Sequence, residues 1–425
     1  MITTICNPSR PDWKALTERN VPDDNAIDAA VAGIIDEVGR DGDGALRRMA
    51  LQFDHNHTGA LQVSEEEIAE ACRNVSPEVK LAVELAAANI RKFHQAQMPD
   101  PVKVETAPGV ICMQRPVPIQ RVGLYIPGGQ APLFSTVLML GIPASIAGCP
   151  EVILCTPQSH DRPISPEILY AATVCGISKI YRTGGAQAIA AMALGTESIP
   201  RVNKIFGPGN RFVTKAKQML SSKVAIDMPA GPSEVLVMAD ETAIPEFVAA
   251  DMLSQAEHGP DSQAICVCTS TMIASAVGEA VEMLQKRLKR ADSVEKSLSH
   301  SRIIVFDNPA SMIDFVNAYG PEHLIISMRD PWDIAEKITA AGSVFIGNYS
   351  PESAGDYASG TNHTLPTNGW AHSYSGVNID SFIRKITYQE LQPEGLQGIA
   401  DTITTMAMAE GLDAHALAVE IRAKS

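Results

Sequence analysis

The sequence lacks the features of a membrane-spanning or exported protein. No apolar run reaches the roughly 18 residues that a membrane-spanning helix needs, and the longest apolar stretch, residues 133–149, is interrupted by Pro143 and by glycines. The first segment, MITTICNPSRPDWKALTERN, contains neither the basic stretch nor the apolar core of a secretory leader. We therefore expect the protein to act in the cytoplasm and to have no membrane partner.

Paired cysteines and an excess of positive charge are also missing. The eight cysteines are scattered, and Cys266 and Cys268 would lie on opposite faces of a strand, where they could not easily share a disulfide or a metal ion. This pattern is typical of reduced, buried thiols in a cytosolic protein. The formal charge of −15 argues against a nucleic-acid partner.

The chain is long enough, and apolar enough, for two large lobes. Its 425 residues exceed the usual size of one domain, and 45% of them are apolar. The first hundred residues predict helices. Apolar positions over residues 27–38 follow helical spacing, Ser64 and Glu67 have the spacing of a capping box, and Ser76-Pro77 marks a helix start.

From about Val110 onward, strand patterns alternate with helix patterns. The runs VGLYIP, EVILCTP, KIYRT and NKIF predict strands, each followed by a helical stretch, and a second set begins near Glu234 with EVLVMAD, AICVCTS, RIIVFD, HLIIS and SVFIGNY. Strands that alternate with helices of this length predict parallel βαβ units and an α/β fold. Beyond Ser350 the chain becomes rich in Gly, Ser and Asn, and one last amphipathic helix is expected over residues 398–422.

Glycine-rich junctions between strand and helix are candidates for ligand contact. Residues 181–187 and 206–210 could bind phosphate, because glycine allows close approach to the backbone and a helix N-terminus attracts anions. Plain tight turns explain them equally well. Neither matches G-x-G-x-x-G, since Phe212 stands at the third glycine position. Tyr125 lies near the expected carboxyl end of a strand, where open α/β sheets bind ligands, or is a half-buried tyrosine at the sheet rim.

Glu322-His323 is the adjacent acid and base with the clearest catalytic potential. The pair follows a Gly-Pro turn and precedes an apolar strand, which places it at a sheet edge. Histidine titrates near neutrality and suits proton abstraction from an alcohol. A solvated loop pair is the alternative that the pattern leaves open.

Candidate metal ligands are spread over the second half of the chain. Gln255 and His258 share one helix face and could bind Zn²⁺ with Asp356 and His415, although a helix-terminal histidine more often caps the last carbonyls. The polar segment after Ser350 also contains further possible ligands, namely His363 and His372.

Taken together, these segments resemble the L-histidinol dehydrogenase family over residues 24–422. The likeness rests on the motifs RVGLYIPGG, GGAQAIAAMALGTESIP, KIFGPGN, AIDMPAGPSEVLV, LSQAEHGPDSQA, GPEHLII, SVFIG, GDYASGTNHTLPT and EGLDAH. The resemblance implies two incomplete Rossmann-like lobes with a helical N-terminal region and a helical C-terminal tail. The first α/β lobe would comprise residues 22–124 and 235–377, and the NAD-binding lobe residues 125–234. An N-terminal arm would span residues 1–21 and the tail residues 378–425.

The resemblance also implies a role for each candidate residue. Zn²⁺, one per subunit, would be bound by Gln255, His258, Asp356 and His415. Acid–base catalysis would fall to Glu322 and His323. NAD would be contacted by Tyr125, Gln187 and Asn210. The substrate would be contacted by Ser233, Gln255, His258, His323, Asp356, Glu410 and His415, with His363 on or beside such a position.

The family is a homodimer whose tail crosses to the partner, so Glu410 and His415 would complete the other subunit's site. The implied reaction converts L-histidinol, two NAD⁺ and water into L-histidine and two NADH, the last steps of histidine biosynthesis.

A zinc- and NAD-dependent relative acting on another small alcohol, such as a sulfonated diol, is the nearest alternative. A non-enzymatic nucleotide-binding or scaffolding protein is a further one. A thiohemiacetal on Cys112 or Cys149 would be a rival chemistry, although neither has a nearby basic motif.

Overall fold

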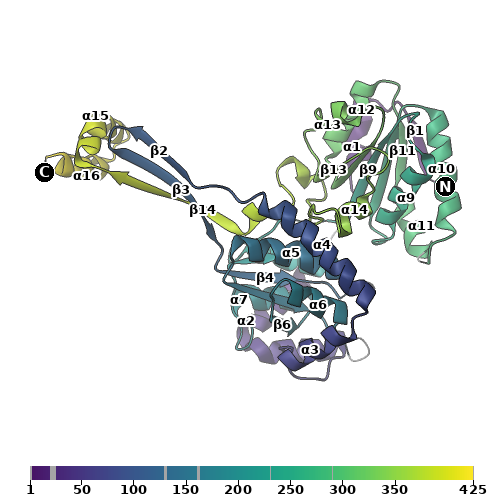
Figure 1. The fold of residues 1–425 in the computed structure, drawn as a ribbon, viewed down its shortest axis with the longest axis horizontal. Helices are drawn as coiled ribbons and strands as arrows, with labels where there is room; N and C mark the ends of the chain where they lie inside the picture. The colour runs from purple at the N-terminus through teal and green to yellow at the C-terminus, as the bar shows by residue number, and fades with distance from the viewer. Residues whose placement is uncertain are drawn as a thin grey trace.

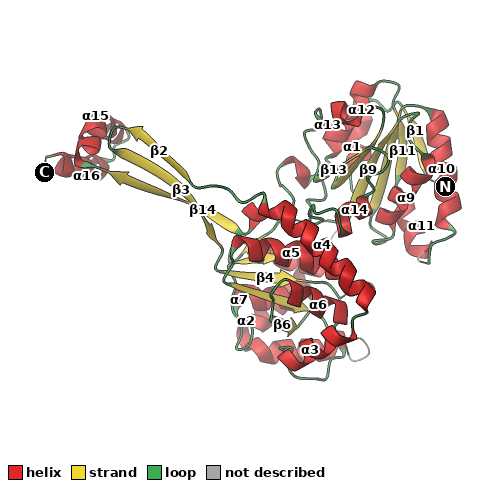
Figure 2. Ribbon diagram, viewed as in Figure 1, coloured by secondary structure: helices red, strands yellow, loops and turns green. Residues whose placement is uncertain are grey.

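Two α/β lobes and a narrow arm make up the molecule in the computed structural model (Figure 1). The structure describes residues 2–19, 25–128, 132–159, 163–229, 231–289 and 291–424. Their strands form a five-stranded, a six-stranded and a three-stranded sheet, and helices flank the two larger sheets (Figure 2). Among the described helices, none combines the length and apolar character needed to cross a membrane.

Five parallel strands form the sheet of the first lobe in the order β6-β5-β4-β7-β8. The strands are β4 (Arg121–Tyr125), β5 (Glu151–Thr156), β6 (Lys179–Arg182), β7 (Lys204–Phe206) and β8 (Ala225–Ile226). The helices that follow the first four are α5 (Phe134–Ala147), α6 (Pro166–Val174), α7 (Gly185–Leu194) and α8 (Arg211–Leu220). The predicted alternation of strand and helix is confirmed here.

Three N-terminal helices complete this lobe: α2 (Asn25–Asp54), α3 (Glu65–Asn74) and α4 (Pro77–Gln95). The capping box is confirmed, because Glu67 N donates to Ser64 Oγ at 3.2 Å and Ser64 N donates to Glu67 Oε2 at 2.9 Å. The predicted grouping of residues 22–124 with residues 235–377 is wrong. Helices α2, α3 and α4 bury their apolar faces against α7, α6 and α5, so they belong with the five-stranded sheet.

The second lobe contains six parallel strands in the order β1-β11-β10-β9-β12-β13. The strands are β1 (Thr3–Cys6), β9 (Glu234–Ala239), β10 (Gln263–Cys268), β11 (Arg302–Val305), β12 (His323–Ser327) and β13 (Ser343–Ile346). The main helices are α9 (Pro245–Ala256), α10 (Thr271–Gln285), α11 (Ala291–His300), α12 (Pro309–Tyr319) and α13 (Pro331–Ala335). Apart from the edge strand β1, which the sequence did not predict, both lobes have the Rossmann-like order 3-2-1-4-5 and lack its sixth strand.

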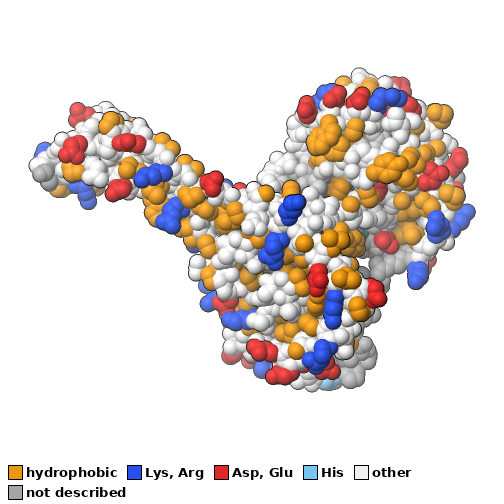
Figure 3. Space-filling model, in the orientation of Figure 1, with side chains coloured by type: hydrophobic (Ala, Val, Ile, Leu, Met, Phe, Trp, Pro, Cys, Tyr) orange, Lys and Arg blue, Asp and Glu red, His pale blue; other side chains and the backbone are white. Residues whose placement is uncertain are grey.

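The arm joins a hairpin over residues 102–118 to the C-terminal part of the chain. Strands β2 (Val102–Ala107) and β14 (Ile383–Leu391) pair antiparallel with β3 (Val110–Pro118), and the tip carries α15 (Pro393–Ala409) and α16 (Asp413–Ala423). The single helix predicted over residues 398–422 is wrong, because Gly411 adopts a left-handed φ of 72° and separates two helices. Hydrophobic side chains are exposed along the arm (Figure 3).

Candidate active site

A cavity of about 160 Å³ lies between the two lobes. Gly207 and Pro208, which follow β7, line it from the five-stranded lobe. Ser233 and Glu322, which directly precede β9 and β12, line it from the six-stranded lobe. The lobes therefore present opposite ends of their strands to one cavity: carboxyl ends from the first and amino ends from the second.

The acid–base pair is buried in this cavity wall. Helix α12 ends at Gly320, whose left-handed φ of 59° turns the chain towards Pro321 and β12. Glu322 and His323 are only 6% and 4% exposed, which excludes a solvated loop pair. Glu322 Oε2 accepts a hydrogen bond of 2.9 Å from Glu234 N, and His323 Nδ1 lies 3.3 Å from Glu234 O. The pair is thus fixed through the backbone of the neighbouring strand.

The electrostatics of the pair follow from burial and from neighbouring carboxylates. Burial raises the pKa of Glu322 above its ordinary value, although His323 opposes the shift. Burial also disfavours the protonated imidazole of His323, but Glu322, Glu352 and Asp356 outweigh it and raise the pKa of His323. His323 Nε2 lies 3.6 Å from Asp356 Oδ1 and has no hydrogen-bond partner among the described residues. This ring nitrogen is left available to a ligand.

Three side chains in the same region could bind a metal ion together. Potential ligand atoms of His258, Glu352 and Asp356 all lie within 4.8 Å of one another. His258 follows the end of α9, whereas Glu352 and Asp356 share α14 (Glu352–Tyr357) at a spacing of four residues. A histidine with carboxylates is a donor set that suits Zn²⁺. The predicted ligand Gln255 lines the cavity too, and with its amide oxygen and nitrogen exchanged, the orientation in which both have partners, it accepts from Glu234 N at 2.6 Å and donates to Glu352.

A second cavity, of about 660 Å³, lies at the carboxyl ends of the five-stranded sheet. Tyr125, Gln187 and Asn210 all line it, as do Phe53 and Asp54 from the end of α2. Tyr125 is the last residue of β4, and its hydroxyl accepts from Gly185 N at 3.1 Å. The turn over residues 206–210 borders both cavities, because its first part lines the small one and its last residue lines the large one.

Known proteins are similar to this chain over nearly its whole length. A family model described as histidinol dehydrogenase matches residues 17–423. The chain is 53% identical over 418 residues to the histidinol dehydrogenase of Vibrio vulnificus strain YJ016, covering 97% of this chain and 96% of that relative. It is 54% identical over 416 residues to the Bacteroides fragilis strain YCH46 enzyme, with coverage of 98% and 97%. The crystal structure of histidinol dehydrogenase from Elizabethkingia anophelis matches with a TM-score of 0.97 at 50% identity, covering 100% of this chain and 98% of that one. The chain belongs to the histidinol dehydrogenase family.

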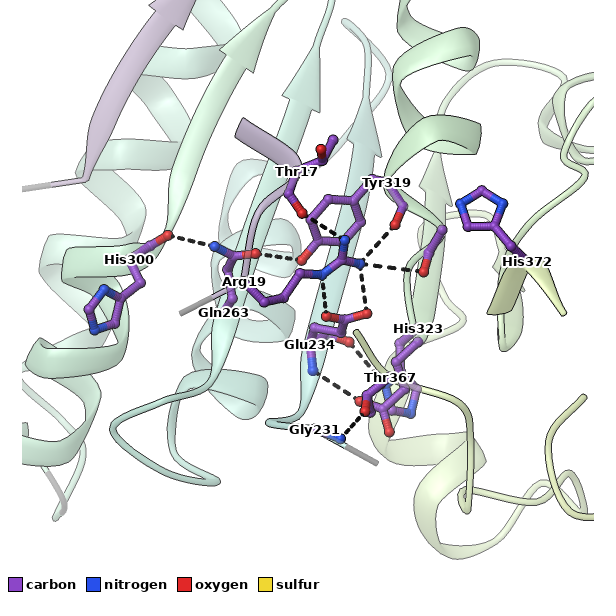
Figure 4. Close-up of polar contacts among 12 residues, drawn as sticks. Thr17, Arg19, Gly231, Glu234, Gln263, His300, Tyr319, His323, Thr367 and His372 are labelled. Atoms are coloured by element: carbon purple, nitrogen blue, oxygen red, sulfur yellow. Dashed lines mark hydrogen bonds and ion pairs between the residues drawn. The ribbon is translucent and has the colours of Figure 1, made fainter. Parts of the chain in front are cut away.

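Membership of the histidinol dehydrogenase family makes the chain an oxidoreductase, and most of its predicted site residues gather at the two cavities. Ser233, Gln255, His258, Glu322, His323, Asp356 and His363 line the small cavity. His363 Nδ1 lies 2.9 Å from Asp356 O and its Nε2 lies 3.1 Å from Thr136 Oγ1, which ties α14 to α5. His372 does not line either cavity and lies apart from His323 (Figure 4).

Two predicted residues are not brought to the site within one chain. Glu410 and His415 are exposed at the tip of the arm, beyond the nine-residue strand β14. Such a strand spans about 30 Å. Whether these residues reach the cavity of another histidinol dehydrogenase subunit stays a prediction.

Sequence reasoning also missed three residues: Glu352 of the possible metal cluster, and Phe53 and Asp54 of the larger cavity. Glu352 could have been found from its spacing of four residues before Asp356, had the segment after Ser350 been read as a helix. Phe53 and Asp54 gave no signal, since they lie at the end of an amphipathic helical segment, beyond the non-helical break at Gly42.

The cysteines do not contribute to either cavity. All eight are free, and neither Cys112 nor Cys149 is among the described lining residues. Burial raises the pKa of Cys149 to about 11, which keeps its thiol protonated near neutral pH. This disfavours a thiohemiacetal route.

Proposed function

We propose that the chain oxidises L-histidinol to L-histidine through L-histidinaldehyde, consuming two NAD⁺ and water, in the last steps of histidine biosynthesis. The observation that carries this proposal is the buried Glu322-His323 pair, which adjoins a possible metal cluster through the 3.6 Å approach of His323 to Asp356. A proton acceptor beside a divalent-cation site suits the oxidation of an amino alcohol, because the acceptor takes the hydroxyl proton while the cation orients the substrate.

The donor atoms present fit a zinc ion. Gln255, His258 and Asp356 would bind it, and His415 of a second copy would complete the set. Bound Zn²⁺ would orient the imidazole and amine of the substrate and, by neutralising nearby carboxylates, favour the neutral form of His323, while NAD⁺ in the larger cavity would accept hydride. Tyr125, Gln187 and Asn210 line that cavity and would contact the dinucleotide.

The chain's own residues would handle the protons of both oxidations. His323 would take the proton of the substrate hydroxyl at Nε2, the atom that lacks a hydrogen-bond partner among the described residues. Glu322 would then help water add to the aldehyde, and His323 would again act as the base in the second oxidation. Ser233 and His363 line the wall around the substrate. A cavity of only about 160 Å³ would retain the reactive aldehyde between the steps.

The active unit would be a homodimer with shared sites. The tail helices expose Met406, Met408, Leu417 and Ile421 by 54–60%, a concentration of apolar surface that favours a protein partner. In such a dimer, Glu410 and His415 of each chain would enter the partner's cavity and contact the substrate. We place the reaction in the cytoplasm, where free cysteines stay reduced.

NADH formation from L-histidinol tests the proposal directly. The purified chain should yield two equivalents of NADH per substrate, and a chelator should abolish the activity until Zn²⁺ is restored. A sulfonated diol should be a poor substrate in the same assay. Preference for the diol would instead favour the alternative of a related zinc enzyme, and no turnover of either alcohol would refute the proposal.

A further inference from the structure

Arg19, at the end of the first described segment, makes several polar contacts next to the acid–base pair, with Thr17, Glu234 and Tyr319. Its Nε donates to Glu234 Oε2 at 2.8 Å and its Nη2 donates to Glu234 Oε1 at 2.9 Å. The two side chains are only 8% and 1% exposed. The guanidinium also lies 3.6 Å from the centroid of the Tyr319 ring, and its Nη1 donates to Thr17 O at 2.8 Å (Figure 4). These contacts hold the planar guanidinium of Arg19 in one orientation.

The backbone of Glu234 is the point to which both members of the pair are attached. Glu234 N donates to Glu322 Oε2, and Glu234 O lies 3.3 Å from His323 Nδ1. In the exchanged orientation of its amide, the Gln255 oxygen accepts from the same N–H. Because Arg19 fixes the side chain of Glu234, it restrains the backbone atoms that orient three residues of the small cavity.

Arg19 also binds the turn that leads into the pair. Its Nη2 donates to Tyr319 O at 2.8 Å, and Tyr319 is the last residue of α12, three positions before Glu322. The Tyr319 hydroxyl in turn donates to Gln263 Oε1 at 2.6 Å, which fixes the end of α12 against β10 (Figure 4). One guanidinium thus connects the start of β9 with the turn before β12.

We propose that Arg19 is a positioning residue for the Glu322-His323 pair, acting through Glu234 and the end of α12. The inference rests on the proposed function and adds a residue from the N-terminal segment to its machinery. A misplacement of about 1 Å at a reacting group can cost on the order of 10²-fold in rate. Substrate binding would change less, because most of its proposed contacts, among them His258, Asp356 and His415, do not depend on Glu234.

The test compares Arg19→Lys with the wild-type enzyme, measured per folded and zinc-loaded subunit. Lysine keeps the charge but loses the two-pronged contact with Glu234. We expect kcat for L-histidinol to fall about 10- to 100-fold, with KM for L-histidinol within about threefold of wild type. Glu234→Gln, which weakens the same contact from the other side, should show the same split, and the double variant should be no slower than the slower single one.

Arg10→Met is the matched control, because Arg10 belongs to the same segment and pairs with Asp314, but its side chain is 74% exposed. Its kcat should equal that of wild type. Folded Arg19→Lys and Glu234→Gln proteins with wild-type kcat would overturn the positioning role, as would a rise in KM alone. If Arg19→Lys does not fold, Glu234→Gln decides by the same criteria, and failure of both to fold would show a purely structural pair. A wild-type chain that does not oxidise L-histidinol would overturn the proposed function instead.

Discussion

His323 Nε2 and Asp356 Oδ1 lie 3.6 Å apart, although they come from different elements, β12 and α14. The contact joins the proposed base to the proposed metal ligands, so that proton transfer and substrate orientation would occur within one small cavity. Separate tests can therefore address His323 as the base, Glu322 in the addition of water, and His415 as the last metal ligand.

His323→Asn should lower kcat for L-histidinol by about 10²–10⁴-fold, the usual contribution of a positioned general base. Asparagine is similar in size and polar, so the zinc content should stay at one ion per subunit. Steady-state NADH formation and metal analysis measure the two quantities. His55→Asn is the control, since His55 is exposed and its left-handed φ of 50° suits asparagine. Near-normal turnover by the His323 variant would refute its role as base.

Glu322→Gln should slow the second oxidation more than the first. The amide retains an oxygen that can accept from Glu234 N, but it cannot accept a proton from water. We expect the aldehyde step to slow by about 10²-fold and NADH to fall from two equivalents towards one when the released aldehyde is trapped. Two full equivalents with equal slowing of both steps would contradict this assignment.

His415 should act in the subunit to which it does not belong. Homodimers of His258→Ala and of His415→Ala should both lose zinc and activity, because each site lacks one ligand. A mixed dimer of the two chains would contain one site with both ligands missing and one intact site. Mixing the chains under conditions that allow exchange should restore up to half of the activity per mixed dimer. No recovery, despite mixed dimers detected by mass, would show that the tail serves its own chain.

Asp54 should make stability depend on pH. Burial raises the pKa of this carboxyl from 3.8 to about 6, so the folded protein binds the proton more tightly than the unfolded chain does. The stability contributed by the neutral carboxyl is complete below about pH 4 and is lost as pH rises through 6. Asp54→Asn removes this loss. Its free energy of unfolding relative to wild type should increase by on the order of 2 kcal/mol between pH 4 and pH 7.

Urea unfolding of both proteins at several pH values measures this difference. Comparison with the variant cancels the contributions of all other titrating groups. A difference that does not vary with pH would show that Asp54 is not perturbed.

Elements with local signals were predictable, and elements defined by distant partners were not. The capping box at Ser64 and the apolar strands of both sheets are encoded in a few adjacent residues. Strand β1 is short and polar, and it becomes a strand only by pairing with β11 at residues 302–305. Likewise β14 depends on β3, which lies far earlier in the chain.

Within the site, too, residues with a local motif were predictable, and residues defined by distant contacts were not. The motif around Glu322-His323 identified the pair, and the structure shows its burial. Arg19 and Glu234 were not selected, because their contribution passes through backbone atoms whose neighbours are set by the register of β9 and β12. No pattern of residue types in the sequence predicts a main-chain contact of this kind. The tail residues Glu410 and His415 were selected only by family resemblance.

The position of β1 has a consequence for how the polypeptide matures. The ribosome makes residues 3–6 long before residues 302–305, and these hydrogen-bonding partners emerge only after the entire first lobe has been synthesised. The leading segment must therefore wait, unpaired, while the intervening chain folds as an inserted unit. The pairing of β1 with β11 would be among the final events in folding. The contacts of Arg19 with Glu234 would form at the same late stage.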